Sequence, residues 1–154
     1  MLESTAAHAT VVVGTLAALA VCVLLQYEAL TLVWQGLSRY TGHRRIKVVY
    51  GILSVLWIHL LQIAIFGVTL WLLCLWPACG SLVAEGERAF FDYLYFSAVT
   101  FSTVGFGEMW PAGAIRFLCG IEALMGFVLI GWSASFAYIE MERFWRADEL
   151  DEKD

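Results

Sequence analysis

Three apolar segments constrain this chain more than any other feature, because each exceeds the roughly 20 residues that cross a bilayer as a helix. They cover residues 9–35, 46–76 and 112–139. Hydrophobic residues make up 61% of the 154 residues and charged residues only 15%. A soluble domain of this size has too little interior to bury so much apolar surface. The sequence therefore predicts an all-α membrane protein with three transmembrane helices.

The basic residues predict how these helices are oriented. Between the first two segments lie Arg39, Arg44, Arg45 and Lys47, and the residues before the first segment include no lysine or arginine. Cytoplasmic loops are enriched in both, so the N-terminus is predicted outside the cell membrane and the C-terminus in the cytoplasm. The first segment is too long for a signal peptide and is predicted to be retained. Cys74 and Cys79 then lie at the outer edge, where a disulfide and two free, buried thiols are both open.

A shorter apolar segment, residues 90–102, lies between the second and third helices and is rich in aromatic residues. It is too short to cross a bilayer, so it predicts a re-entrant helix that enters from outside and stops partway. The negative, C-terminal end of its dipole would then point at the membrane centre. Irregular backbone at that depth is tolerated only inside protein or beside water.

Thr103, Val104, Gly105, Phe106 and Gly107 follow this segment directly. Two glycines separated by one residue let the backbone adopt conformations that other residues avoid, so that successive carbonyl oxygens can face a common axis. An outer helix, a short pore helix, this motif, a proline and an inner helix occur here in the order found in potassium channels. Over about residues 46–146 the chain resembles the tetrameric potassium channel pore-domain family.

The resemblance implies a role for each residue of the motif. The carbonyl groups of Thr103, Val104, Gly105 and Phe106, with the Thr103 hydroxyl, would form the stacked K⁺ sites, and Gly107 would close the outer mouth. One chain supplies a quarter of such a filter, so the resemblance implies a homotetramer in the lipid bilayer. The expected function is passive, potassium-selective conduction. No cofactor apart from the permeant K⁺, no nucleic acid and no enzymatic activity is expected.

The sequence departs from the family around the filter. Phe106 replaces the commoner tyrosine, Glu108 replaces the usual aspartate, and Val99 stands where some bacterial members have a glutamate that binds that aspartate. Glu108 therefore needs another partner, and Tyr95, Trp110 and water are the candidates. These side chains are expected to support the filter or its outer mouth.

Three further ionisable side chains are predicted at membrane depth, where each needs a partner. Glu122 is expected behind the filter, against Ser102, Thr100 or a neighbouring helix, either as a filter support or proton-sensitive gate, or as a neutral packing residue. Glu28 and His59 lie at similar depths on the first two helices and form a possible pair. The alternative is that each faces a different neighbour.

The inner helix carries the residues expected to gate the pore. Gly126 matches the family's hinge glycine. Phe127, Ile130 and Ala134 share one helical face, which in the family lines the inner cavity and could gate by dewetting, although lipid or helix packing is the alternative.

The predicted organisation has three parts. Residues 1–45 form the extra N-terminal helix and basic loop, residues 46–139 the pore module, and residues 140–154 a short acidic cytoplasmic tail. The extra helix lacks the regularly spaced arginines of a voltage sensor. Two other functions remain open, namely a poorly selective cation channel and a non-conducting membrane subunit of a larger transport complex.

Overall fold

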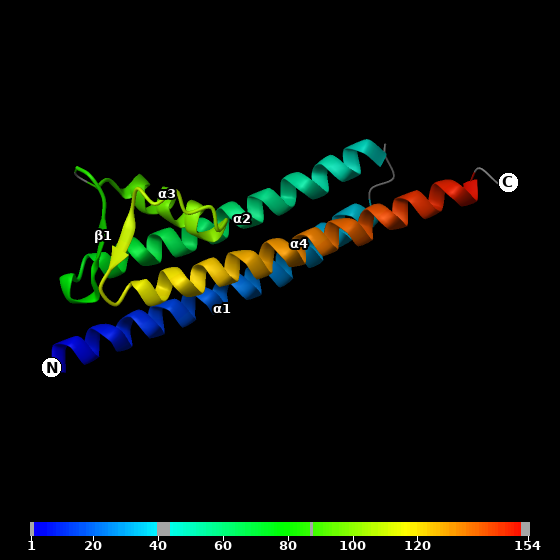
Figure 1. The fold of residues 1–154 in the computed structure, drawn as a ribbon. Coiled ribbons are helices and arrows are strands. Elements are labelled where there is room, and N and C mark those ends of the chain that lie inside the picture. Colours follow the sequence, from blue (N-terminus) through cyan, green and yellow to red (C-terminus); the bar gives the residue numbers. More distant parts are fainter. Residues whose placement is uncertain (1, 40–43, 87, 152–154) are drawn as a thin grey trace.

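The computed structural model describes residues 2–39, 44–86 and 88–151, and Figure 1 shows their arrangement. Its elements in chain order are α1 (Leu2–Arg39), α2 (Arg44–Cys74), a 3-10 turn η1 (Pro77–Cys79), β1 (Ser81–Val83), α3 (Phe90–Phe101), β2 (Trp110–Ala112) and α4 (Arg116–Asp151). Three helices, α1, α2 and α4, are long and apolar enough to cross a membrane. The fold is therefore that of an all-α, multi-pass membrane protein, as predicted. Residues 40–43 of the basic loop lie outside the described residues.

The three long helices run along one another. α1 and α4 run in the same direction and α2 in the opposite one, so the N-terminus lies at the end that carries α3 and β1, and the C-terminus at the far end (Figure 1). α1 packs against both α2 and α4 of its own chain. The extra helix is thus part of the same body as the predicted pore module.

A continuous apolar core joins the helices. Its largest fully buried side chains include Phe66 and Leu70 of α2, Phe101 of α3, and Leu118 and Leu129 of α4. Many other large apolar side chains of α1, α2 and α4 are exposed on the outer faces of the bundle. This distribution suits a lipid solvent, in which outward-facing apolar residues carry no penalty.

A small antiparallel sheet, absent from the sequence prediction, joins the segments on either side of α3. Its register pairs Ser81 with Ala112 and Val83 with Trp110. Gly80 permits this approach, since its φ is 122° and a side chain there would overlap the Ala112 carbonyl group. The third long helix consequently begins at Arg116 rather than at residue 112.

The predicted acidic tail is helical as far as the structure describes it. α4 continues without a break through residue 140 to Asp151, and residues 152–154 lie outside the described residues. Cys74 and Cys79 are free thiols, which decides between the two alternatives left open by the sequence. Cys79 is buried against α1, where its Sγ lies 3.9 Å from the Ala7 carbonyl oxygen, and burial raises the pKa of this thiol.

Candidate functional site

α3 positions the motif loop. Its first turn is capped by Asp92, whose Oδ2 accepts a hydrogen bond of 2.7 Å from the Ala89 amide. Its last turn closes where the Ser102 amide donates to the Ala98 carbonyl at 3.1 Å. The 12 residues of α3 span about 18 Å, too little to cross a bilayer. The helix packs mainly against α2 and α4, so the motif loop begins beside these two helices.

The backbone of the motif loop alternates in conformation. φ is positive at Thr103 (60°), Gly105 (53°) and Gly107 (84°), whereas it is not positive at the intervening Val104 and Phe106. A left-handed conformation costs a non-glycine residue about 1–2 kcal/mol, so Thr103 is held in a strained state. Strain of this kind concentrates at functional sites.

Hydrogen bonds to α3 fix the direction of the loop's peptide groups. The Thr103 amide donates to the Thr100 carbonyl at 2.9 Å, and the amides of Val104 and Gly105 both donate to the Val99 carbonyl, at 3.0 and 3.2 Å. In a planar trans peptide, the N–H and the preceding C=O point in opposite directions. The carbonyl groups of Ser102, Thr103 and Val104 therefore point away from α3, toward the exposed side of the loop. Val99 supports the loop through its backbone rather than its side chain.

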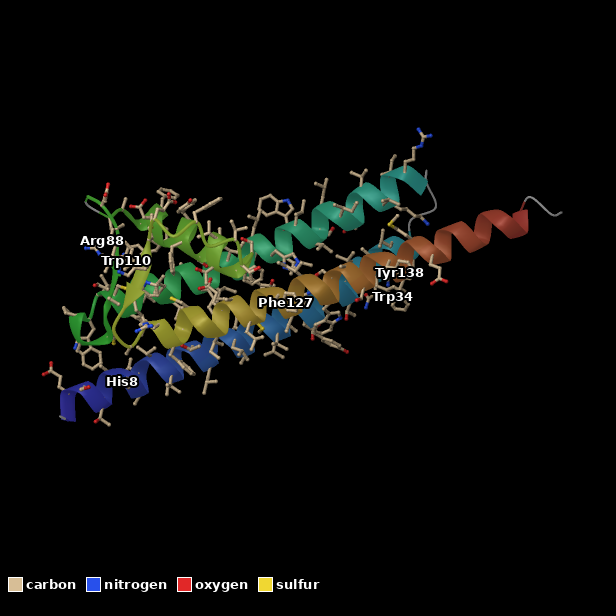
Figure 2. The ribbon with its side chains drawn as sticks, viewed as in Figure 1. His8, Trp34, Arg88, Trp110, Phe127 and Tyr138 are labelled. Carbon is tan, nitrogen blue, oxygen red and sulfur yellow. The ribbon has the colours of Figure 1, made fainter. Side chains whose placement is uncertain are left out.

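The outer end of the loop is held by a side-chain contact. The Tyr95 hydroxyl of α3 donates a hydrogen bond to Oε1 of Glu108, and this bond raises the pKa of Tyr95. Of the candidate partners for Glu108, the structure thus selects Tyr95. Trp110 lies in β2 and is exposed at the same end of the molecule as Arg88 and His8 (Figure 2).

Glu122 is fully buried behind α3. Ser97 Oγ is hydrogen-bonded to Glu122 Oε1 and also donates to the Ile63 carbonyl of α2 at 2.8 Å. The partner of Glu122 is therefore on a neighbouring helix, α3, but it is Ser97 rather than Thr100 or Ser102. This contact joins α2, α3 and α4 at one point, behind the helix that positions the loop.

α4 packs tightly against the end of α3 at Gly126. A side chain there would overlap the carbonyl group of Phe101, the last residue of α3. α4 runs through Gly126 without interruption. In this structure, the glycine is needed for packing beneath the loop, and its hinge role stays a prediction.

Gly126→Ala is accordingly expected to lower the stability of the folded chain by about 1–3 kcal/mol, as overpacking does. Gly131→Ala is the matched control, because nothing lies within 4 Å of a side chain added at Gly131. Thermal unfolding of the purified proteins in detergent measures both. Equal melting temperatures for the two variants would contradict the packing role.

A hollow of about 420 Å³ lies beneath the loop. It is lined by Ser102, Thr103, Phe127, Val128, Ile130 and Gly131. Phe127, near the middle of α4 in Figure 2, is 70% exposed and Ile130 is 41% exposed. Ala134 is exposed on the same helix but does not line this hollow. Two of the three residues predicted for the inner cavity thus lie directly below the loop.

The possible pair of Glu28 and His59 is not formed. Glu28 is exposed on α1, whereas His59 Nδ1 lies 2.9 Å from Gln62 Oε1 and its ring centroid 5.7 Å from that of Phe101. A nearby amide satisfies the imidazole, which removes the need for a carboxylate partner.

Sequence reasoning missed Ser97 and a set of three further buried polar residues. Gln26, Gln62 and Ser133 come from three different helices, and each is at most 2% exposed. Their only signal in the sequence is a polar side chain inside an apolar segment, which gives neither a spacing nor a partner. They are hydrogen-bonded in series, and Gln62 lies next to His59.

A family model described as an ion channel matches residues 57–143. The match begins in α2 and takes in α3, the motif loop, the hollow beneath it and most of α4. No curated protein and no solved structure matches the chain. Because the family match covers more than half of the chain and all the elements that form the candidate site, the chain belongs to this ion channel family.

Proposed function

We propose that this chain is one of four identical subunits of a potassium-selective channel. The direction of the motif-loop carbonyl groups carries the proposal. Three consecutive amides are bonded back to α3, so the carbonyl groups of Ser102, Thr103 and Val104 face the open side, and φ alternates in sign from Thr103 to Gly107. A column of such carbonyl oxygens can replace the hydration shell of K⁺.

Fourfold assembly is proposed because the carbonyl oxygens of one chain can surround an ion on one side only. The loop residues 103–108 are exposed in the single chain, as are Phe127 and Ile130 beneath them. Four columns around a common axis would surround an ion on all sides, and cyclic homo-oligomers form through one repeated interface. The hollow of each chain would then open on a shared inner cavity, whose apolar wall at Phe127 and Ile130 would gate by dewetting.

The electrostatics of the chain favour a cation. α3 points its C-terminal, negative end at the space below the loop, and Glu108 adds a carboxyl group at the outer end. We propose that the N-terminus and the loop's outer end face the outside of the cell, because Arg45 and Lys47 lie at the opposite end of α2 and basic residues favour the cytoplasmic side. K⁺ would cross passively, by knock-on between adjacent sites.

Ion flux through the purified chain in liposomes tests this function. With K⁺ and Na⁺ present on both sides, the reversal potential is expected to shift by about 59 mV for each tenfold change in the K⁺ gradient and to be independent of the Na⁺ gradient. A reversal potential that follows both ions would identify a poorly selective cation channel instead. Liposomes that pass no ions at any pH would favour a non-conducting subunit.

A further inference from the structure

A chain of hydrogen bonds crosses the interior of the bundle and includes the extra helix. Gln26 of α1 donates through Nε2 to Ser133 Oγ of α4 at 2.8 Å. Gln62 of α2 donates through Nε2 to Gln26 Oε1 at 2.9 Å and to the Cys22 carbonyl at 3.3 Å. Gln26 therefore connects Gln62 of α2 to Ser133 of α4.

The direction of each hydrogen bond in this series is fixed by which groups can donate and which can accept. Gln62 Oε1 lies 2.9 Å from His59 Nδ1, and because an amide oxygen only accepts, the imidazole donates. Each amide thus accepts from one neighbour and donates to the next. No water competes for these groups inside a membrane, so an amide that lost its partner would stay unsatisfied. The residues consequently hold one another in a single arrangement.

The two ends of this hydrogen-bond series, His59 and Ser133, lie next to parts of the proposed conduction path. The His59 ring lies against Phe101, the last residue of α3 before the motif loop. Ser133 lies on α4 beyond Gly126, and it is buried toward α1, whereas Ile130 lines the hollow. α1 and α4 lie side by side at this level (Figure 1). The extra helix therefore contacts the stretch of α4 that would move if the inner helix gated the pore.

We infer that α1 is a built-in gating element, in which Gln26 holds the part of α4 beyond Gly126 through Ser133 and is itself held by Gln62 and His59 beneath the filter. This inference rests on the proposed channel function. A contact shifts a gating equilibrium only if it differs between the two states. The bond from Gln26 to Ser133 meets that condition if α4 bends below Gly126, since bending would separate the two side chains while the filter stayed in place.

Ser133→Ala and Gln26→Leu provide the test, with single-channel recording in planar bilayers. Each is expected to change the ratio of open to closed time by about fivefold or more, and in the same direction. The reversal potential should be unchanged, because no filter residue is altered. The change in gating free energy in the double variant should differ from the sum of the changes in the two single variants, since each substitution removes the same bond.

Matched controls separate this role from general packing. Ser135→Ala removes a hydroxyl two residues away, which bonds to the Gly131 carbonyl of its own helix at 3.0 Å. Thr31→Ala does the same on α1, where the hydroxyl bonds to the Tyr27 carbonyl at 2.9 Å. Both should gate as the wild type does. Ser133→Thr keeps a hydroxyl and should restore normal gating.

Thermal unfolding of the same variants in detergent tests the contact without conduction. Non-additive melting temperatures for Gln26→Leu and Ser133→Ala are expected, and additive ones would overturn the contact. Unchanged open probability in both variants, or changes in opposite directions, would overturn the gating role. If the wild-type chain passes no ions, the proposed channel function and the gating role are both wrong. The unfolding measurements still test the contact between Gln26 and Ser133 in that case.

Discussion

Replacing Gly105 with alanine is expected to abolish K⁺ flux while leaving the chain folded. The backbone at Gly105 has a φ of 53°, in the left-handed region, and an alanine there costs about 1–2 kcal/mol. The peptide can escape this cost by rotating out of the left-handed region, which would turn a carbonyl group away from the proposed ion path. In the proposed tetramer all four subunits would carry the defect, so the ion path would be disrupted on every side. Liposome flux under a K⁺ gradient measures the loss.

Gly86→Ala is the matched control for this prediction. Gly86 has a φ of 84°, lies in the exposed loop before α3, and like Gly105 has nothing within 4 Å of an added side chain. The backbone penalty is therefore similar, but the site is remote from the motif. Flux should survive in Gly86→Ala at near wild-type levels. Normal flux through Gly105→Ala would show that the motif loop is not the ion path, and equal loss in both variants would point to a folding defect.

The main elements of the fold could be predicted because lipid imposes a simple rule. Long apolar segments must become helices that satisfy their own backbone, and this gave α1, α2 and α4. The ends of α4 could not be predicted in the same way, since composition does not reveal hydrogen bonds. Pairing of β1 with β2 delays its start to Arg116. At the other end, the charged residues after 140 mark the limit of the apolar segment but are good helix formers, and the helix continues.

The candidate site was predictable where residues close in sequence determine it. The alternating glycines and the short helix before them specify the loop locally, and Tyr95 was among the candidate partners of Glu108. Partners on other helices were not predictable, because a single sequence holds no record of tertiary contacts. Gln26 and Ser133 are 107 positions apart, and Gln26 and Gln62 are 36 apart. An isolated glutamine in an apolar segment signals that a partner exists and says nothing of its identity.

The contact of Glu122 with Ser97 indicates which of the two groups carries the shared proton. A serine hydroxyl carries one proton, yet Ser97 Oγ contacts two acceptors, the Ile63 carbonyl and Glu122 Oε1. The carbonyl has no proton to offer, so if Ser97 donates to Ile63, the carboxyl group must supply the other proton. Oε2 has no hydrogen-bond partner in the described part of the chain and is buried, which also disfavours a charge. Glu122 is therefore expected to be a neutral acid that donates to Ser97.

Glu122→Gln should then be tolerated, since a carboxamide has nearly the same shape as a protonated carboxyl group and can donate to Ser97 in its place. We expect thermal stability within about 1 kcal/mol of the wild type and normal K⁺ flux. Glu122→Ala should lower the stability of the folded chain by about 3 kcal/mol, because it opens a cavity and removes the bond that ties α4 to α3. Flux should fall with it, since α3 positions the motif loop. If glutamine proved as damaging as alanine, Glu122 would instead be a carboxylate whose charge the site requires, and the assignment of the proton would be wrong.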